Sequence, residues 1–209
     1  MVDFLKGTFS PLGRKYIMAL TGFLLGVFLL MHAAGNSFIF QGKAAFNAYA
    51  ERLHSLGPLV PTVELLLFII FLTHIIFGLT LFLANREATG SRYAVKHSAG
   101  GKTWGSRTMP WTGFALLAFL LLHLCNVRFI EEGAPLGDVV GQTLANPLYA
   151  LFYFVGITAL TLHVSHGFWS LLQTWGLYHP RYNRLTRLGA WALAALIGLV
   201  FCSVIVFVW

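Results

Sequence analysis

Five long uncharged segments decide what this chain can fold into. Each has at least twenty consecutive residues without Asp, Glu, Lys or Arg. A helix needs about 20 apolar residues to cross a bilayer, and only helices or closed barrels satisfy their backbone polar groups in lipid. Barrel strands alternate between a lipid face and a lumen face, whereas these runs are uniformly apolar. The sequence therefore predicts an all-α integral membrane protein with five transmembrane helices, near residues 16–35, 62–84, 111–129, 147–177 and 188–209.

The composition agrees with a single membrane domain over residues 1–209. Hydrophobic residues make up 57% of the chain and charged residues 10%, with a mean hydropathy of +0.74. The fourth predicted span is unusually long, roughly 46 Å at the helical rise, so we expect it to tilt or to project beyond the lipid. No clear internal repeat stands out. The two cysteines lie inside spans without a Cys-x-x-Cys motif, which gives no zinc or disulfide framework.

The net charge of +7 is divided unevenly between the two ends of the predicted bundle. Eleven of the fourteen basic residues fall on the side of the N-terminus and of the loops 85–110 and 178–187. The positive-inside rule then puts the N-terminus in the cytoplasm and Trp209 outside. The basic side would face anionic lipid and a cytoplasmic protein partner, and this distribution argues against nucleic acid as a partner.

Four of the five spans carry a histidine deep in an apolar run: His32, His74, His123, and either His163 or His166. An imidazole in hydrocarbon is costly unless it is paired or bound to something. Counted from the outer polar boundary at the helical rise, His32 and His123 lie roughly 6–8 Å deep, His74 roughly 15 Å and His163 roughly 24 Å. We name His32 and His123 the outer pair, and His74 and His163 the inner pair.

Two levels with two histidines each are the arrangement for two haems stacked across a membrane, each with two axial imidazoles. A porphyrin also needs close approach of the helix backbone, which small residues permit. Glycines follow three of the histidines by three or four residues and so share their helical faces: Gly35, Gly78 and Gly167. The sequence therefore favours two haem b groups as cofactors.

The span histidines have alternative roles that these residues alone leave open. A single histidine in a span is often a polar group bonded to a neighbouring helix, although four at two matched depths are harder to explain in this way. Zinc and copper also bind imidazole, but such sites usually gather three or four ligands at one level. In the fourth span Gly167 favours His163 over His166, which could instead bond a haem propionate or a neighbouring helix. The remaining histidines fall in loops or at span boundaries and are not expected to be ligands: His54, His97 and His179.

Two acidic residues lie near the outer boundary. Glu64 begins the second span, where a carboxylate suits a helix N-terminus. Glu51 lies in the stretch 46–53, which can form an interfacial amphipathic helix, ended by Gly57-Pro58. The simple interpretation of Glu51 is a solvated helix face. The alternative is a proton-exchanging group at a quinone site, since quinone reduction takes up protons together with electrons.

The order of histidines over five spans resembles the di-haem cytochrome b membrane subunit of succinate:quinone oxidoreductases, the fumarate reductases and succinate dehydrogenases that work with menaquinone. The resemblance covers nearly the whole chain. The family has a ligand histidine in the fourth span, a glycine four residues later, an aromatic pair or near equivalent, and a Trp-Gly. The matching residues here are Leu162-His163-Val164-Ser165-His166-Gly167-Phe168-Trp169-Ser170 and Thr174-Trp175-Gly176. Thr21-Gly22-Phe23 before His32 and Thr112-Gly113-Phe114 before His123 also fit.

The resemblance implies a role for each histidine. His32 and His123 would hold the haem far from the cytoplasm, and His74 and His163 the nearer one. Glu51 falls near a family carboxylate at the outer quinone site. The chain departs from the family at Thr161. Some members carry a glutamate there, two residues before the fourth-span ligand, and that glutamate is thought to help protons cross. A transmembrane proton route of that kind is therefore not implied for this chain.

The resemblance also implies a membrane anchor and electron conduit in a bacterial cytoplasmic membrane. The chain has no strand–Gly-rich turn–helix unit for FAD, so it would not itself interconvert succinate and fumarate. Its cytoplasmic partners would be an FAD-containing flavoprotein and an iron–sulfur protein. Electrons would pass between the iron–sulfur protein, the inner haem, the outer haem and menaquinone, in either direction.

Two alternatives belong to different functional classes. A di-haem cytochrome b subunit of a hydrogenase or formate dehydrogenase would usually have its catalytic partners outside, whereas the large basic surface here favours docking from the cytoplasm. A transporter or purely structural anchor would bind no haem.

Overall fold

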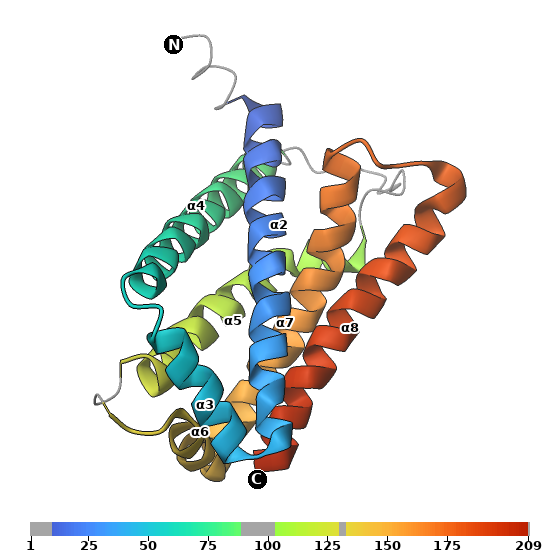
Figure 1. Cartoon of the computed structure of the whole chain (residues 1–209). Helices are drawn as coiled ribbons and strands as arrows, with labels where there is room; N and C mark the ends of the chain where they lie inside the picture. The colour runs from blue at the N-terminus through green and yellow to red at the C-terminus, as the bar shows by residue number, and fades with distance from the viewer. Residues whose placement is uncertain (1–9, 89–102, 130–132, 209) are drawn as a thin grey trace.

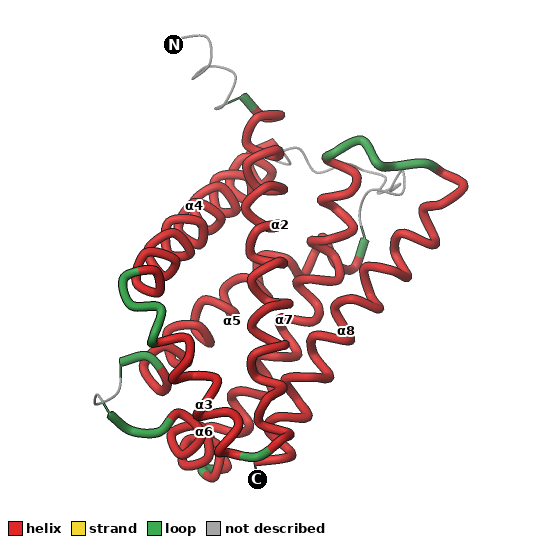
Figure 2. The backbone as a smooth tube through the Cα atoms, viewed as in Figure 1, coloured by secondary structure: helices red, strands yellow, loops and turns green. Residues whose placement is uncertain are grey.

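The computed structural model describes residues 10–88, 103–129 and 133–208. Trp209 and His97, which the sequence placed outside the membrane spans or at their ends, lie outside the described residues. Several charged residues also lie outside them: Lys6, Arg92, Lys96, Lys102, Glu131 and Glu132. The described part is all-α, and no strand occurs among these residues (Figure 2). The predicted fold class is confirmed at this level.

Within the described residues, five helices are long and apolar enough to cross a membrane. By helix length and hydropathy, the chain is therefore a multi-pass membrane protein. Figure 1 shows that α2 begins and α8 ends at opposite ends of the bundle. The five helices are α2 (Pro11–Asn36), α4 (Leu59–Ala88), α5 (Trp104–Val127), α7 (Pro147–Thr174) and α8 (Asn183–Val208).

Polar caps set where three of these helices begin. Ser10 Oγ accepts a hydrogen bond of 3.0 Å from the backbone N–H of Gly13 in the first turn of α2. Thr103 Oγ1 accepts in the same way at the start of α5, at 3.1 Å, so that a polar capped turn precedes the apolar run. For this reason α5 begins at Trp104 rather than near residue 111. Asn146 caps α7 with Pro147 as its first residue, a position that suits proline because the first N–H of a helix has no partner within it.

Two short helices lie at the end of the bundle where α8 ends (Figure 1). The predicted amphipathic helix is present as α3 (Lys43–His54), which follows the 3₁₀ turn η1 (Ser37–Gln41). The second, α6 (Leu136–Ala145), lies in a segment that the sequence indicated only as a loop. Its formation depends on tertiary packing, because Leu144 is buried in a cluster formed mainly by α7 and α8 side chains. A helix this short is marginal alone and is stabilised by such contacts.

The two short helices also contact each other. Lys43 of α3 forms an ion pair of 3.0 Å with Asp138 of α6. The Asn47 side-chain oxygen accepts a 2.7 Å hydrogen bond from the backbone N–H of Gly137. Both contacts join the connection between α2 and α4 to the connection between α5 and α7.

The long helices pack unequally. α2 lies against α4 and α7, and α7 lies also against α5 and α8. α4 has none of its described residues buried in the fold, since it packs mainly on α2. A second 3₁₀ turn, η2 (Pro180–Tyr182), leads from α7 into α8. The four long helices that carry the predicted ligand histidines are thus α2, α4, α5 and α7, and α8 closes one side.

Candidate functional site

The fold brings the four span histidines together as two pairs. The ring centroids of His32 on α2 and His123 on α5 lie 6.0 Å apart, with the ring planes at 83°. Those of His74 on α4 and His163 on α7 lie 6.4 Å apart, at 65°. All four side chains are half-buried. The grouping is the one that the depth count gave, and each pair joins two helices far apart in the sequence.

The inner pair is contacted by hydroxyls from neighbouring helices. Thr21 Oγ1 of α2 lies 3.0 Å from His74 Nδ1. Thr112 Oγ1 of α5 lies 3.1 Å from His163 Nδ1. Both threonines are buried, with 7% and 8% of their surface exposed, and Ser165 is the one further buried polar residue in the described part of the chain. The hydrogen bond made by one ring nitrogen decides whether the other nitrogen is protonated or is free to bind a metal.

Glycines lie close to the same two imidazoles. A Cβ added at Gly22 would lie 3.4 Å from Cε1 of His74, and one added at Gly113 would lie 3.7 Å from Cε1 of His163. Gly78, four residues after His74, lies under Met18, where a Cβ would be 3.4 Å from the methionine methyl. A larger residue at Gly22 or Gly78 would therefore crowd the contact between α2 and α4, the helix that carries His74.

The outer pair is surrounded by aromatic rings instead. Phe28 stacks on His32 with centroids 5.3 Å apart, and Phe119 stacks on His123 at 5.7 Å. Tyr153 of α7 approaches His123 at 5.8 Å. His123 Nδ1 is buried and has no hydrogen-bond partner among the described residues. Asn36 Nδ2 lies 3.4 Å from His32 Nε2, so the outer imidazoles are oriented mainly by aromatic packing and, at His32, also by this longer contact.

An internal repeat in α2 and α5 contains both histidines of the outer pair and both threonines that contact the inner pair. The stretches 18–32 and 109–123 are identical at nine of fifteen positions, and these include the methionine, Thr-Gly-Phe, phenylalanine and histidine described above. The threonine and the histidine are eleven residues apart in both copies, three turns plus about 20°, and so share one helical face. The conclusion that no clear repeat is present was wrong. The two matching Thr-Gly-Phe motifs are the sequence signal that identifies this repeat, and with it four neighbours of the histidines: Thr21, Thr112, Phe28 and Phe119.

His166 has different surroundings from His163. A Cβ added at Gly105 would lie 2.6 Å from its Nδ1, so the ring lies close against the start of α5. Its ring lies 5.6 Å from that of Trp169, and its Nδ1 reaches Thr103 Oγ1 only at 3.5 Å. The geometry therefore brings His163, and not His166, beside His74.

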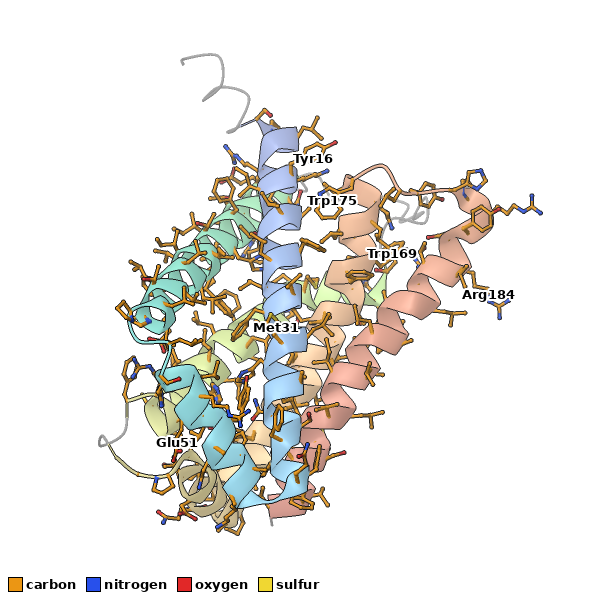
Figure 3. The ribbon with its side chains drawn as sticks, viewed as in Figure 1. Tyr16, Met31, Glu51, Trp169, Trp175 and Arg184 are labelled. Atoms are coloured by element: carbon orange, nitrogen blue, oxygen red, sulfur yellow. The ribbon has the colours of Figure 1, made fainter. Side chains whose placement is uncertain are left out.

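Near the end of the bundle where α2 begins, aromatic side chains of the sequence motifs contact other parts of the fold. Phe23, from the first Thr-Gly-Phe, packs edge-on against Trp175 with centroids 5.3 Å apart. Trp169 donates from Nε1 to Asn183 Oδ1 at 2.9 Å, and the Arg187 guanidinium lies 4.3 Å from the centre of its ring. Figure 3 shows Trp169, Trp175, Tyr16 and Arg184 toward the end where α2 begins.

The remaining predicted residues lie away from the pairs. Glu51 is exposed on α3, at the opposite end of the molecule from Trp175 (Figure 3). Its neighbour Tyr49 covers Gly35, three residues after His32. Glu64 does not lie at a helix N-terminus as expected, because α4 begins at Leu59 and has no acidic residue in its first turn. Its carboxylate accepts two hydrogen bonds from Arg128, at 2.8 and 3.0 Å, and so ties the second turn of α4 to the end of α5. His54 is exposed, and His179 accepts a backbone hydrogen bond from Arg181.

Thr161, where some members of the resembled family have a glutamate, lies between α7 and α8. Its hydroxyl donates to the Ile157 carbonyl at 2.9 Å and lies directly against Gly198 of α8. The side chain is thus used in helix packing, away from the ring of His163.

The donor set fits a metal that needs two protein ligands at each level. Transition-metal–imidazole bonds of about 2 Å place two rings on opposite sides of one ion with centroids about 6 Å apart. The observed separations are 6.0 and 6.4 Å. No group of three or more His, Cys, Asp or Glu side chains suited to a metal ion occurs among the described residues. Further ligands would have to come from the bound group, as the four nitrogens of a porphyrin do.

Comparisons with protein-family models, with curated proteins and with solved structures found no match to this chain.

Proposed function

We propose that the chain is the membrane anchor and di-haem b electron-transfer subunit of a fumarate reductase or succinate dehydrogenase complex. The observation that carries the proposal is the pair of imidazole pairs, with ring centroids 6.0 and 6.4 Å apart on four helices. Four neutral imidazoles without a carboxylate or thiolate among them suit haem iron better than zinc.

Each part of the chain has one role in this proposal. His32 and His123 hold the outer haem, and His74 and His163 the inner one. When bound, haem iron supplies one-electron oxidation and reduction. The protein sets the orientation of the imidazoles, excludes water from the two levels and separates them along α2 by about 16 Å, the length of eleven residues.

The two ends of the molecule would serve different partners. Basic side chains at the end where α2 begins, including Arg14, Arg107 and Arg187, suit anionic lipid and docking of the iron–sulfur and FAD-containing subunits. At the opposite end, exposed Glu51 on α3 would exchange protons with menaquinone. The proposal places that end outside the bacterial cytoplasmic membrane.

A reduced-minus-oxidised absorption spectrum of the purified chain tests the proposal. We expect a b-type signal and two haems per chain by pyridine haemochrome assay. Absence of haem would refute the proposal and favour a transporter or structural anchor. Co-purification from the native membrane then separates the respiratory classes: flavoprotein and iron–sulfur partners on the cytoplasmic face are expected, whereas partners on the outer face would favour the hydrogenase or formate dehydrogenase class.

The quinone role is tested in the complete complex with Glu51→Gln. Menaquinone-coupled activity should fall while both haem signals stay unchanged, because the residue is exposed and away from the histidine pairs. Unchanged quinone kinetics would refute the role of Glu51.

A further inference from the structure

We infer that Thr21 and Thr112 are positioning residues: each hydroxyl holds the Nδ1 side of an inner-pair imidazole so that its Nε2 is the nitrogen left to bind iron. The inference rests on the proposed function, since it concerns the haem between His74 and His163. It adds a chemical difference between the two haem sites that the ligand set alone does not contain.

The first step concerns the threonine proton. Thr21 Oγ1 lies 2.8 Å from the Ile17 carbonyl oxygen and 3.2 Å from that of Met18. A carbonyl can only accept, and a hydroxyl has one proton to donate. Since the hydroxyl proton is donated within its own helix, the 3.0 Å contact to His74 requires Nδ1–H as donor and Oγ1 as acceptor.

Thr112 repeats the arrangement on another pair of helices. Its Oγ1 lies 3.1 Å from the carbonyl oxygens of Thr108 and Met109 and 3.1 Å from His163 Nδ1. The two sites are in equivalent positions of the internal repeat, and in each the next residue is the glycine that faces the imidazole Cε1. The same contact formed twice, from α2 to α4 and from α5 to α7, is difficult to attribute to chance packing.

The second step concerns the imidazole. A neutral ring has one N–H, so a proton held on Nδ1 leaves the lone pair on Nε2. Partners on the far side of a ligating histidine fix its tautomer and raise its basicity. A more basic ligand stabilises ferric over ferrous iron. Loss of either hydroxyl should therefore raise the midpoint potential of the inner haem.

An ordinary threonine in a membrane helix does not have this property. Several threonines of this chain bond only their own helix, and Thr158 is an example: it is exposed and its hydroxyl donates to the Phe154 carbonyl at 2.9 Å. Such back-bonding is common and by itself indicates no function. The difference at Thr21 and Thr112 is burial together with an imidazole nitrogen at hydrogen-bond distance.

The test compares Thr21→Val and Thr112→Val with Thr21→Ser and Thr112→Ser, using Thr158→Val as the matched control. Valine keeps the shape and removes the hydroxyl, while serine keeps the hydroxyl. The variants are purified in the same way as the parent chain, and the signals of the two haems are first assigned with His74→Ala and His123→Ala. The readouts are haem content, the two midpoint potentials and the electron paramagnetic resonance of the ferric centres.

We expect each valine variant to raise the midpoint potential and shift the ferric signal of the inner haem alone, or to weaken inner haem retention by about 10- to 100-fold. The serine variants and the control should match the parent. Parent-like potentials and spectra in both valine variants would overturn the inference, as would an equal shift of both haems. If a valine variant loses both haems, recovery in its serine partner supports the inference and failure of that partner overturns it. A parent chain without haem would instead refute the proposed function.

Discussion

The inner and outer histidine pairs are held by different contacts, although the threonines beside one pair and the histidines of the other belong to the same repeat in α2 and α5. At the inner level, a threonine hydroxyl lies within hydrogen-bond distance of each Nδ1. At the outer level, phenylalanine rings stack on the imidazoles and His123 Nδ1 has no partner among the described residues. Two sites with the same pair of imidazole ligands can thus differ in ligand basicity, and in potential, through their neighbours alone.

The largest effect should come from removing one ligand at one level. His74→Ala should abolish the inner haem and leave the outer one, and His123→Ala should do the reverse, because each pair is formed by a different set of helices. Haem stoichiometry and low-temperature difference spectra measure this. Loss of the same spectral component in both variants would show that the two histidines do not belong to separate centres.

The choice within α7 comes next. His163→Ala should remove the inner haem, whereas His166→Ala should keep both, since only His163 lies beside His74. Gly105→Ala is a second probe, because its Cβ would displace the His166 ring from a distance of 2.6 Å. Equal haem content in the two histidine variants, or loss of the inner haem in Gly105→Ala alone, would contradict the assignment.

A smaller effect should separate the levels without touching a ligand. A Cβ at Gly156 would overlap the ring of Phe119, which stacks on His123. Gly156→Ala should therefore perturb the outer haem spectrum and lower stability by about 1–3 kcal/mol, as overpacking does, while the inner haem stays as in the parent. Gly26→Ala is the matched control, since nothing lies within 4 Å of its added Cβ. An equal response of both haems to Gly156→Ala would show that packing at Phe119 does not act on the outer level alone.

The smallest effect should come from the ion pair at the outer edge. Glu64→Gln removes the charge that contacts Arg128 at 2.8 Å, but the side chains of Arg128 and Glu64 are 57% and 41% exposed. Exposed pairs contribute about 0–1 kcal/mol, so thermal stability should fall only slightly and both haem signals should persist. A marked loss of the outer haem in this variant would mean that the α4–α5 connection, and not aromatic packing, governs the outer level.

Some parts of the site could be predicted from the sequence better than the rest. The depth count placed His32 with His123 and His74 with His163, because the rise per residue of a helix is fixed. The sequence did not predict α6, because this short segment is stabilised as a helix by packing on α7 and α8. The sequence motifs also indicated no role for Thr21 and Thr112. The repeat that contains both residues is nevertheless visible when residues 18–32 are aligned with 109–123.

By itself, the sequence determined that the chain has five membrane-length helices and where along its helix each span histidine lies. Long uncharged runs admit one kind of backbone in lipid, and position along a helix follows from counting. Only the tertiary structure brought the ring of His163, and not that of His166, beside His74. The rotation of one helix against another depends on how side chains of distant segments interlock, and a single helix contains no information about its neighbour's face.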